Sequence, residues 1–314
     1  MAAKLMHAVC YEAYGGGPSG LKHVEVPAPV AKNDEVLLKV EAASINPVDW
    51  RMQKGTMRPI LPCKFPYVPA TDLAGEVVAV GSGVKNFKPG DKVVTYLSHA
   101  RGGGLAEFAV SKEKTTVIRP AEVSAAEGAG LPIAGVTAYR AVTYSAGVNL
   151  DGSGPQKNIL ITAASGGVGQ YAVQLAKLGK THVTATCGAR NIELIKSLGA
   201  DEVLDYKTPD GAALKSPSGK KYDAVIHCAT KGIPWSTFKP HLSATGKVID
   251  ITPGPSVWLT CAVQKLTFSK KKIVPLIVFP RGEDVAYLVN LVKEGKLKTV
   301  IDSKHPLSKA EDAW

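Results

Sequence analysis

Hydrophobic and polar positions follow two different rhythms along the 314-residue chain. In the first third, short β-branched runs are separated by turn residues, and no strong helical period accompanies them. This pattern predicts strands at 35–41, 75–80, 92–96 and 107–110. Short strands joined by irregular loops indicate a partly open β-barrel.

After about residue 130, continuous apolar runs alternate with segments of helical spacing. The runs predict strands at 157–163, 182–186, 202–204, 222–228, 247–251 and 273–279. The segments between and after them predict helices at 168–178, 191–198 and 283–294, and a basic surface loop at 209–221. Alternation of this kind is typical of a parallel α/β sheet with both faces covered, so the fold class is α/β.

Charge is the one unusual feature of the composition. The 38 Lys and Arg residues exceed the 27 Asp and Glu residues, which gives a net charge of +11. Such a charge suits nucleic acid, an anionic membrane or a phosphate-bearing ligand, and an ordinary solvated surface is the alternative interpretation. The longest uncharged stretch, 158–176, contains polar residues, and we interpret it as strand, turn and helix instead of a membrane span.

The cysteines give no sign of a disulfide framework or of local zinc spacing. Their number is odd, and neither CxxC nor HExxH occurs in the chain. The first residues do not lead into a long apolar run, so no secretory signal is predicted. A cleavable transit peptide would be rich in Arg and Ser, whereas the first Arg of this chain is Arg51.

A glycine-rich turn follows the predicted strand 157–163 and opens the helix 168–178. Read from Ala164, it is A-x-G-x-x-G, a dinucleotide-binding turn that ends at Gly169. The free N–H groups and positive dipole of the helix N-terminus would meet the phosphates of a cofactor. A tight turn without a ligand is the alternative. We therefore expect four residues to bind cofactor: Ser165, Gly166, Gly167 and Val168.

The end of the next predicted strand bears on the choice between NAD and NADP. An acidic residue about 20 residues after the glycines holds the ribose 2′-OH of NAD, but 186–190 contains none. Gly188 leaves room there, and Arg190 can pair with a 2′-phosphate, which favours NADPH. The alternative is that Arg190 is merely solvated. A short-chain reductase is excluded because no Tyr has Lys four residues on.

Further segments match a known pattern at 44–49, 81–84, 89–93, 104–108 and 131–138. Together with the glycine turn they resemble the medium-chain dehydrogenase/reductase superfamily, in its zinc-free quinone oxidoreductase (zeta-crystallin-like) branch. The resemblance implies a discontinuous GroES-like catalytic domain at 1–128 and 285–314. It also implies a Rossmann NADP-binding domain at 129–284, with the active-site cleft between the two domains.

The resemblance also implies that no metal is bound. Where zinc-containing relatives carry a ligand Cys, this chain has Asn46, and where they carry a ligand His it has Thr71. The segment 97–104, in place of the lobe with four structural cysteines, contains no Cys.

By resemblance, three residues are candidates for catalysis. Asn46 would orient the substrate carbonyl, Arg51 would lie by the cofactor, and Tyr67 is a candidate proton donor. Asp49 would brace the site. A loop-capping Asn and a surface Arg are the alternative interpretations. Four further residues would contact the cofactor, at the nicotinamide, beside the adenine and at the ends of two strands: Thr137, Tyr206, Cys228 and Thr252.

The implied activity is hydride transfer from NADPH to a quinone or an α,β-unsaturated carbonyl compound. The alternative is an NADPH-binding protein with a role in RNA or membrane binding. Aromatic residues are only 6% and do not interleave with basic ones, which makes nucleic acid the weaker alternative. The resemblance further implies a homodimer and a peripheral place at the chloroplast envelope without a cleavable transit peptide. A cytoplasmic location is the alternative, and we expect the natural chain to continue past Trp314.

Overall fold

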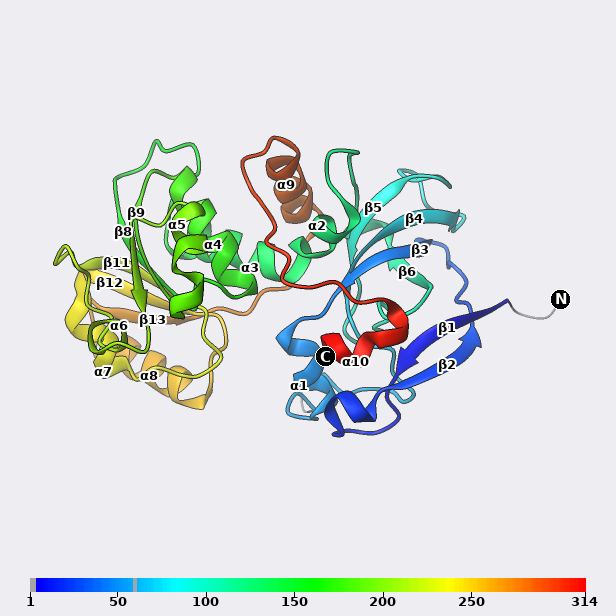
Figure 1. The fold of residues 1–314 in the computed structure, drawn as a ribbon, viewed down its shortest axis with the longest axis horizontal. Helices are drawn as coiled ribbons and strands as arrows, with labels where there is room; N and C mark the ends of the chain where they lie inside the picture. Colours follow the sequence, from blue (N-terminus) through cyan, green and yellow to red (C-terminus); the bar gives the residue numbers. More distant parts are fainter. Residues whose placement is uncertain (1–3, 59–60) are drawn as a thin grey trace. The chain divides into compact units, whose positions relative to one another are not determined.

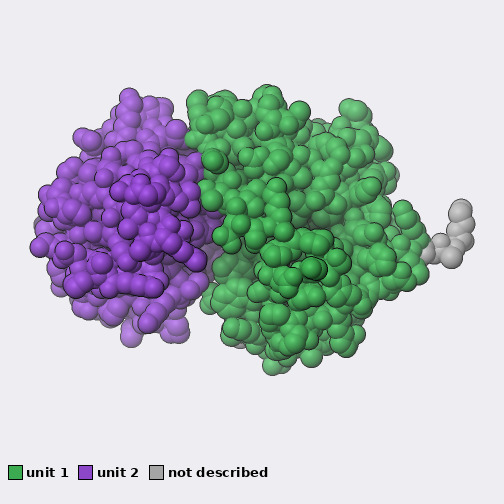
Figure 2. All heavy atoms as spheres, viewed as in Figure 1, with its two compact units in different colours: residues 1–133, 280–314 green, residues 134–279 purple. Residues whose placement is uncertain are grey.

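The computed structural model describes residues 4–58 and 61–314 (Figure 1). The chain divides into two compact units (Figure 2). Unit 1 comprises residues 1–133 and 280–314, and unit 2 comprises residues 134–279. Unit 2 is therefore inserted into unit 1 in sequence, as the resemblance implies for its Rossmann domain.

Unit 1 is built on a five-stranded antiparallel sheet. Its strand order is β6-β3-β4-β5-β7. The strands are β3 (Glu35–Ser44), β4 (Asp72–Val80), β5 (Lys92–Tyr96), β6 (Phe108–Lys112) and β7 (Thr116–Ile118). The four strands predicted from the β-branched runs are confirmed as β3, β4, β5 and β6. Valines and leucines on one face form its core, because alternate side chains of a strand point to the same side.

A second, two-stranded sheet in unit 1 was not predicted. It pairs β1 (Leu5–Cys10) with β2 (Lys22–Pro27). Isolated bridges connect Ala8 with Ala106 and Tyr11 with Tyr67. None of the residues of β2 is fully buried, and the alternation of its sequence is short, with only Val24 and Val26 packing against the core.

The helices of unit 1 come from both parts of the chain. They are α1 (Pro47–Gln53), α2 (Ala125–Ala129), α9 (Gly282–Lys293) and α10 (Ala310–Ala313). Helix α9 packs on β5 and β7 and buries Val285 and Leu288 completely. The Ile133 N–H donates to the Asp72 carboxylate of β4. These contacts explain why the unit boundaries lie at 133/134 and 279/280, against the expected 128/129 and 284/285.

Unit 2 is a six-stranded parallel sheet. Its strand order is β10-β9-β8-β11-β12-β13. From β8 the chain adds β9 and β10 on one side of the sheet, and then β11, β12 and β13 on the other side, so the order of strands reverses between β8 and β11. The strands are β8 (Asn158–Thr162), β9 (His182–Cys187), β10 (Glu202–Asp205), β11 (Tyr222–His227), β12 (Leu242–Asp250) and β13 (Lys272–Pro275). This order is that of a Rossmann fold, whose ligand site lies at the carboxyl ends of the strands where the order reverses.

Helices lie on both faces of this sheet, with α4 and α5 on one face and α7 and α8 on the other (Figure 1). The helices of unit 2 are α3 (Val136–Arg140), α4 (Gly167–Leu178), α5 (Ile192–Ser197), α6 (Pro209–Ala212), α7 (Trp235–Phe238) and α8 (Pro255–Leu266). Wide, π-helical turns at 131–135 and 141–145 flank α3. The surface loop predicted at 209–221 begins with the short helix α6, which Thr208 caps, so the prediction is wrong over residues 209–212.

The strand predicted at 273–279 is wrong in its second half. Strand β13 is the sheet edge and ends at Pro275. Ile277 and Phe279 beyond it are 61% and 59% exposed. The apolar run of the sequence is therefore longer than the strand. Its last side chains lie on the surface of unit 2, outside the core.

The net charge is unequally divided between the units. Unit 2 holds 17 lysines and arginines against 8 aspartates and glutamates, which is +9 of the total +11. Most ion pairs of the described residues lie in unit 1, for example that of Arg101 with the buried Glu35. Within the described part of the chain, no helix combines the length and the apolar character needed to cross a bilayer.

Candidate functional site

The glycine turn of unit 2 connects β8 to α4. Ala163 adopts a left-handed conformation with φ 48°, and its carbonyl accepts the N–H of Gly166 at 2.9 Å. The Ala164 N–H donates to Thr186 of β9 at 2.8 Å, which ties the turn to the neighbouring strand. Gly166 is the N-cap of α4, and no side chain caps this helix end. The first N–H groups of α4 are therefore not claimed by a side chain.

The turn leaves the backbone exposed where α4 begins. A side chain at Gly169 would lie 2.4 Å from the Ala163 carbonyl oxygen, so only glycine lets α4 begin this close to the turn. Gly166 and Gly167 are exposed, whereas Ser165 and Val168 are half-buried. An exposed backbone at an uncapped helix N-terminus binds anions through its N–H groups and the helix dipole. Four predicted cofactor-binding residues thus lie together here.

Three more of the predicted residues meet at the carboxyl ends of β9 and β10. The β9–β10 register pairs Cys187 with Asp205, which places Gly188 beside Tyr206. The Tyr206 side chain is 53% exposed, so the alternative of a buried core tyrosine does not apply. A Cβ at Gly188 would make an ordinary contact of 3.6 Å with the Tyr206 ring. Arg190 is exposed in the 3₁₀ turn 189–191 that follows.

Lys207 adds a cation that sequence reasoning missed. Its ammonium group lies 6.0 Å from the centroid of the Tyr206 ring. The signal was available in the sequence, because Lys207 directly follows Tyr206. Together with the exposed Arg190 it gives the carboxyl-end edge of β9 and β10 two positive groups.

The remaining strand-end residues form a hydrogen-bonded set at β8, β11 and β12. Thr162 Oγ1 accepts the Cys228 N–H at 3.1 Å and lies 2.8 Å from His227 Nδ1. The Thr252 hydroxyl donates to the Ala229 carbonyl at 3.2 Å. Burial raises the pKa of the Cys228 thiol to about 12, so this thiol stays protonated. The sequence analysis singled out Cys228 and Thr252 as cofactor contacts, which stays a prediction, and did not single out Thr162 or His227.

Thr137 lies on α3, which packs against α4. Its side chain is half-buried. The helix therefore holds Thr137 within unit 2, near the helix that the glycine turn opens. A role at the nicotinamide stays a prediction.

In unit 1, Asn46 connects two buried carboxylates. Its Nδ2 donates to Asp72 Oδ2 at 3.1 Å, and its backbone N–H donates to Asp49 Oδ2 at 2.8 Å. Asp49 Oδ1 also accepts the Ala70 N–H at 3.2 Å, and Asp72 Oδ2 accepts the Ile133 N–H at 2.8 Å. Asn46 is the N-cap of α1, as the capping interpretation expects. Its role in orienting the substrate carbonyl stays a prediction.

Burial decides the protonation of these two acids. It raises the pKa of Asp49 to about 7, although the two backbone N–H groups oppose this shift. Burial raises the pKa of Asp72 well above its usual range, and the charge of Asp49 raises it further. Burial therefore favours the neutral form of Asp72, and the pKa of Asp49 lies close to neutral pH.

Tyr67 and Arg51 lie in different surroundings. Tyr67 is 3% exposed, and its hydroxyl donates to the His99 carbonyl at 2.6 Å. Burial raises its pKa above the usual range. Arg51 lies half-buried in the last turn of α1, where the helix dipole favours a cation. It forms no ion pair with a carboxylate of the described residues.

Asn46 and Thr71 occupy the positions where zinc relatives carry ligands. Thr71 is fully buried beside Asp72. Across residues 4–58 and 61–314, no three His, Cys, Asp or Glu side chains are grouped so that they could hold a metal ion. Independence from zinc stays a prediction.

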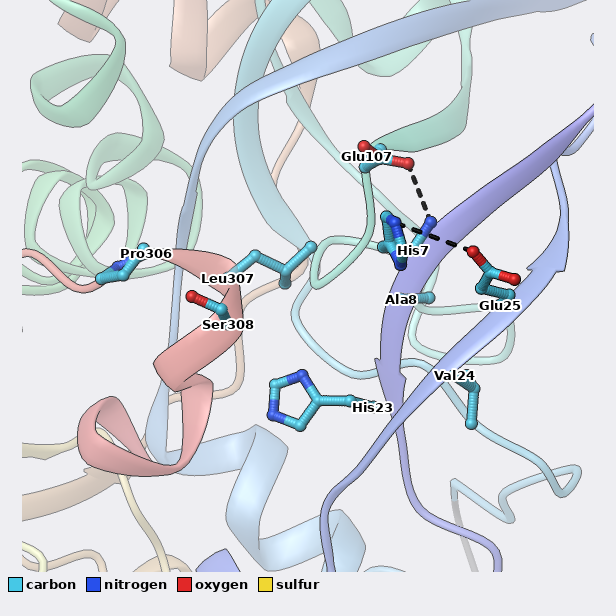
Figure 3. Close-up of a pocket in the computed structure, with 9 residues that line it drawn as sticks. All are labelled: His7, Ala8, His23, Val24, Glu25, Glu107, Pro306, Leu307 and Ser308. Atoms are coloured by element: carbon cyan, nitrogen blue, oxygen red, sulfur yellow. Dashed lines mark hydrogen bonds and ion pairs between the residues drawn. The ribbon is translucent and has the colours of Figure 1, made fainter.

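A separate groove of about 560 Å³ lies in unit 1 between β1, β2 and residues 306–308 (Figure 3). It contains none of the predicted site residues. His7 at its wall forms a 3.8 Å ion pair with Glu25, and the His7 N–H donates to Glu107 at 2.8 Å. His23 lies 3.1 Å from Glu311. Its histidines are thus already engaged by glutamates.

The Rossmann sheet with its glycine turn, inserted into an antiparallel unit, is the architecture of medium-chain dehydrogenases and reductases, and the chain belongs to this superfamily. Residues 32–122 match the family described as "Alcohol dehydrogenase GroES-like domain", and residues 198–314 match "Zinc-binding dehydrogenase". Enzymes of this superfamily are oxidoreductases that use a nicotinamide cofactor.

Within the superfamily, the relatives point to the quinone oxidoreductase branch. The chain is 71% identical over 314 residues to the "Chloroplast envelope quinone oxidoreductase homolog" of Arabidopsis thaliana, covering 100% of this chain and 95% of that protein. It is 34% identical to the "NADPH-dependent alkenal/one oxidoreductase, chloroplastic" of the same plant, covering 99% of this chain and 76% of that protein. The solved quinone oxidoreductase from Coxiella burnetii has 31% identity and a TM-score of 0.85, covering 99% of this chain and 94% of that one.

Proposed function

We propose that the protein is an NADPH-dependent, zinc-independent reductase that transfers hydride to quinones or α,β-unsaturated carbonyl compounds. The observation that carries the cofactor choice is the edge at β9 and β10. No acid follows β9 before Arg190, Gly188 presents no side chain beside Tyr206, and Arg190 is exposed. A guanidinium group binds a phosphate bidentately, and an acid there would repel it.

Each part of unit 2 has a role in holding the cofactor. The N–H groups of the first turn of α4, which begins at Gly167, bind the diphosphate, and Arg190 with Lys207 binds the 2′-phosphate. The remaining contacts, at the adenine, the nicotinamide ring and its carboxamide, come from Tyr206, Thr137, Cys228 and Thr252. When bound, the cofactor supplies hydride. Gly169 is the residue that lets the turn approach the helix closely enough for this binding.

Residues of unit 1 stabilise the charge that develops on the substrate. Hydride addition to the β-carbon of an enone moves negative charge onto the carbonyl oxygen. The Asn46 amide, held by Asp72, and the Arg51 guanidinium, which has no carboxylate partner among the described residues, can donate to that oxygen. For a quinone the same donors stabilise a hydroquinone anion. Conjugation already polarises the acceptor, so no Lewis acid is needed.

The test is oxidation of NADPH and NADH against a panel of quinones and of short- and long-chain enones. Arg190→Ala should raise the KM for NADPH about 10- to 100-fold, which corresponds to the ~1.5–3 kcal/mol of a hydrogen bond to a charged group. The KM for NADH should stay the same. Lys265→Ala, which removes one exposed cation from α8 of the same unit, is the matched control. Equal use of NADH and NADPH by the unaltered protein would contradict the cofactor assignment.

The competing function is NADPH binding without turnover, combined with binding of RNA or of a membrane. Absence of turnover on the whole panel, together with steeply salt-dependent RNA binding, would favour it. The similarity to a chloroplast envelope relative supports a peripheral place at that membrane, with the cytoplasm as the alternative. Formation of a homodimer stays a prediction, which sedimentation of the purified chain tests.

A further inference from the structure

A group of buried titratable side chains lies on one face of unit 1, around β4 and β5. Asp72 of β4 and Tyr96 of β5 are directly paired across the two strands. Side chains of such a pair lie on the same face, with their Cβ atoms about 4.5–5.5 Å apart. Because Asp72 also accepts the Asn46 amide, Tyr96 lies on the sheet face that holds the residue proposed to bind the substrate oxygen.

Tyr96 is hydrogen-bonded to a histidine three residues further along. The Tyr96 hydroxyl lies 2.7 Å from His99 Nδ1, and the two rings are 5.6 Å apart. Tyr96 is 9% exposed and His99 is 8% exposed. His99 Nε2 has no hydrogen bond to another described residue. This nitrogen is therefore left for a water molecule.

Both members of this pair are neutral. Burial lowers the pKa of His99 to about 4, and burial with the charges of Asp72 and Asp49 raises the pKa of Tyr96 above its usual range. In the tautomer that carries a proton on Nδ1, His99 donates to the Tyr96 oxygen. The phenolic hydrogen of Tyr96 is then free to be donated elsewhere.

Tyr67 offers a contrast in the same unit. Its hydroxyl donates its one hydrogen to the His99 carbonyl at 2.6 Å. A carbonyl oxygen has no proton to return, so a proton lost from Tyr67 has no donor behind it in this arrangement. Tyr96 has such a donor in His99 Nδ1.

We propose, on the basis of the function proposed above, that Tyr96 is the catalytic acid for enones and that His99 restores its proton from solvent. After hydride has reached the β-carbon, the Tyr96 O–H bond breaks and a C–H bond forms at the α-carbon. The electron pair of the enolate forms that bond, and the C=O bond is restored. The phenolate oxygen takes the Nδ1 proton of His99, and His99 Nε2 takes a proton from a water molecule, which leaves as hydroxide.

This step predicts a difference between two substrate classes. An enone needs a proton on carbon, which is slow without a positioned acid. A hydroquinone anion takes its proton on oxygen, which solvent supplies readily. Tyr96→Phe should therefore lower kcat for enones about 100-fold and change kcat for quinones by no more than about threefold. Tyr11→Phe is the matched control, because it removes another buried tyrosine hydroxyl of unit 1, one in contact with Cys63.

The stereochemistry of protonation separates a positioned acid from a merely structural residue. In D₂O, the unaltered protein should place deuterium on one face of the α-carbon of an α-substituted enone. Tyr96→Phe should release the enolate and give both faces. His99→Asn, which keeps a polar atom near Nδ1, should retain single-faced labelling better than His99→Leu.

A readout without turnover is nitrogen NMR of the histidine rings. The Nδ1 resonance of His99 should move in Tyr96→Phe and stay in place in Tyr11→Phe. Unchanged enone turnover with single-faced deuterium in Tyr96→Phe would overturn the assignment of Tyr96, as would loss of single-faced labelling in Tyr67→Phe alone. If the unaltered protein reduces neither enones nor quinones, the proposed function itself fails, which is a distinguishable result.

Discussion

At the scale of single residues, burial sets the chemistry of unit 1 more than sequence neighbours do. Asp49 and Asp72 are both fully removed from solvent, and no described cation forms an ion pair with either of them. Both carboxyl groups therefore favour the neutral form. The family resemblance implied Asp49 as a brace of the site. The bond from Asn46 to Asp72 could not be predicted, because it depends on a β3–β4 register that two irregularities shift.

Asp49 should make the stability of unit 1 depend on pH. Its pKa is about 7 in the folded protein, against an ordinary value of 3.8, so between pH 4 and 7 the folded state holds a proton that the unfolded chain has released. Raising the pH through this window lowers the free energy of unfolding, by on the order of 4 kcal/mol at pH 8. Below pH 4 both states are protonated and the contribution vanishes.

Urea denaturation of the unaltered protein and of Asp49→Asn from pH 4 to pH 8 measures this effect. The difference between their free energies of unfolding should change across the window, because the variant cannot titrate at this position. Asp302→Asn, at an exposed position, should follow the unaltered protein. Parallel profiles for the unaltered protein and Asp49→Asn would contradict the assignment.

Two glycines of the α4 turn should respond differently to one added methyl group. In Gly169→Ala the new Cβ would lie 2.4 Å from the Ala163 carbonyl oxygen and 2.6 Å from the Ala164 Cα, so backbone must move. In Gly167→Ala its nearest neighbour is the Ala134 Cβ at 3.8 Å. We expect Gly169→Ala to lower the melting temperature by several degrees, for a cost of about 1–3 kcal/mol. Gly167→Ala should stay near the original value in the same calorimetric scan.

At the scale of elements, the parallel sheet was predictable because each of its central strands is buried on both faces. Strands such as β8 and β11 read as continuous apolar runs, and helices separate them at regular intervals. Helix α8 was not predicted, because it exposes apolar side chains instead of burying them. Its outward side carries Trp258, Leu259 and Leu266, which are 49–79% exposed, so polar and apolar positions do not alternate with a helical period.

Helix α9 should stabilise unit 1 although the chain reaches it only after unit 2. Leu288 is fully buried where α9 packs on β5 and β7. Leu288→Ala should lower the free energy of unfolding by about 2–5 kcal/mol, the cost of a buried leucine truncation. Hydrogen exchange should show faster exchange in β5 and β7 and no change in β8 or β9. Tyr287→Ala, on the more exposed side of the same helix, should have a smaller effect.

At the scale of the whole molecule, the charge that distinguished the sequence belongs chiefly to unit 2. Part of it lies at the proposed phosphate contacts, Arg190 and Lys207. Much of the rest is on lysines such as Lys220 and Lys270, which are exposed and have no carboxylate partner among the described residues. Composition gave the total of +11, but its division into +9 and +2 required the boundaries of the units.

Unit 2 should therefore direct the protein to an anionic bilayer. Sedimentation with phosphatidylglycerol vesicles should show binding at about 20 mM salt and release at about 500 mM, because salt screens exposed charges. Neutral vesicles should not bind. Reversing Lys220 and Lys270 to Glu should weaken binding more than reversing Lys64 and Lys304 of unit 1, at the same change in net charge. Binding that resists salt would contradict this expectation.

The insertion of unit 2 has a consequence for how the chain is made. On the ribosome, residues 1–133 emerge before α9, so the sheet of unit 1 waits for a helix encoded beyond residue 280. Residues 134–279 are continuous and emerge in full before α9, so unit 2 can complete its fold while β5 and β7 still lack that helix. Once folded, that insertion holds its two ends at fixed places, and closing unit 1 costs less entropy than closing a flexible loop of the same length. During synthesis, the apolar surface of β5 and β7 thus stays uncovered until α9 emerges. We expect a chaperone to bind the nascent chain at this surface.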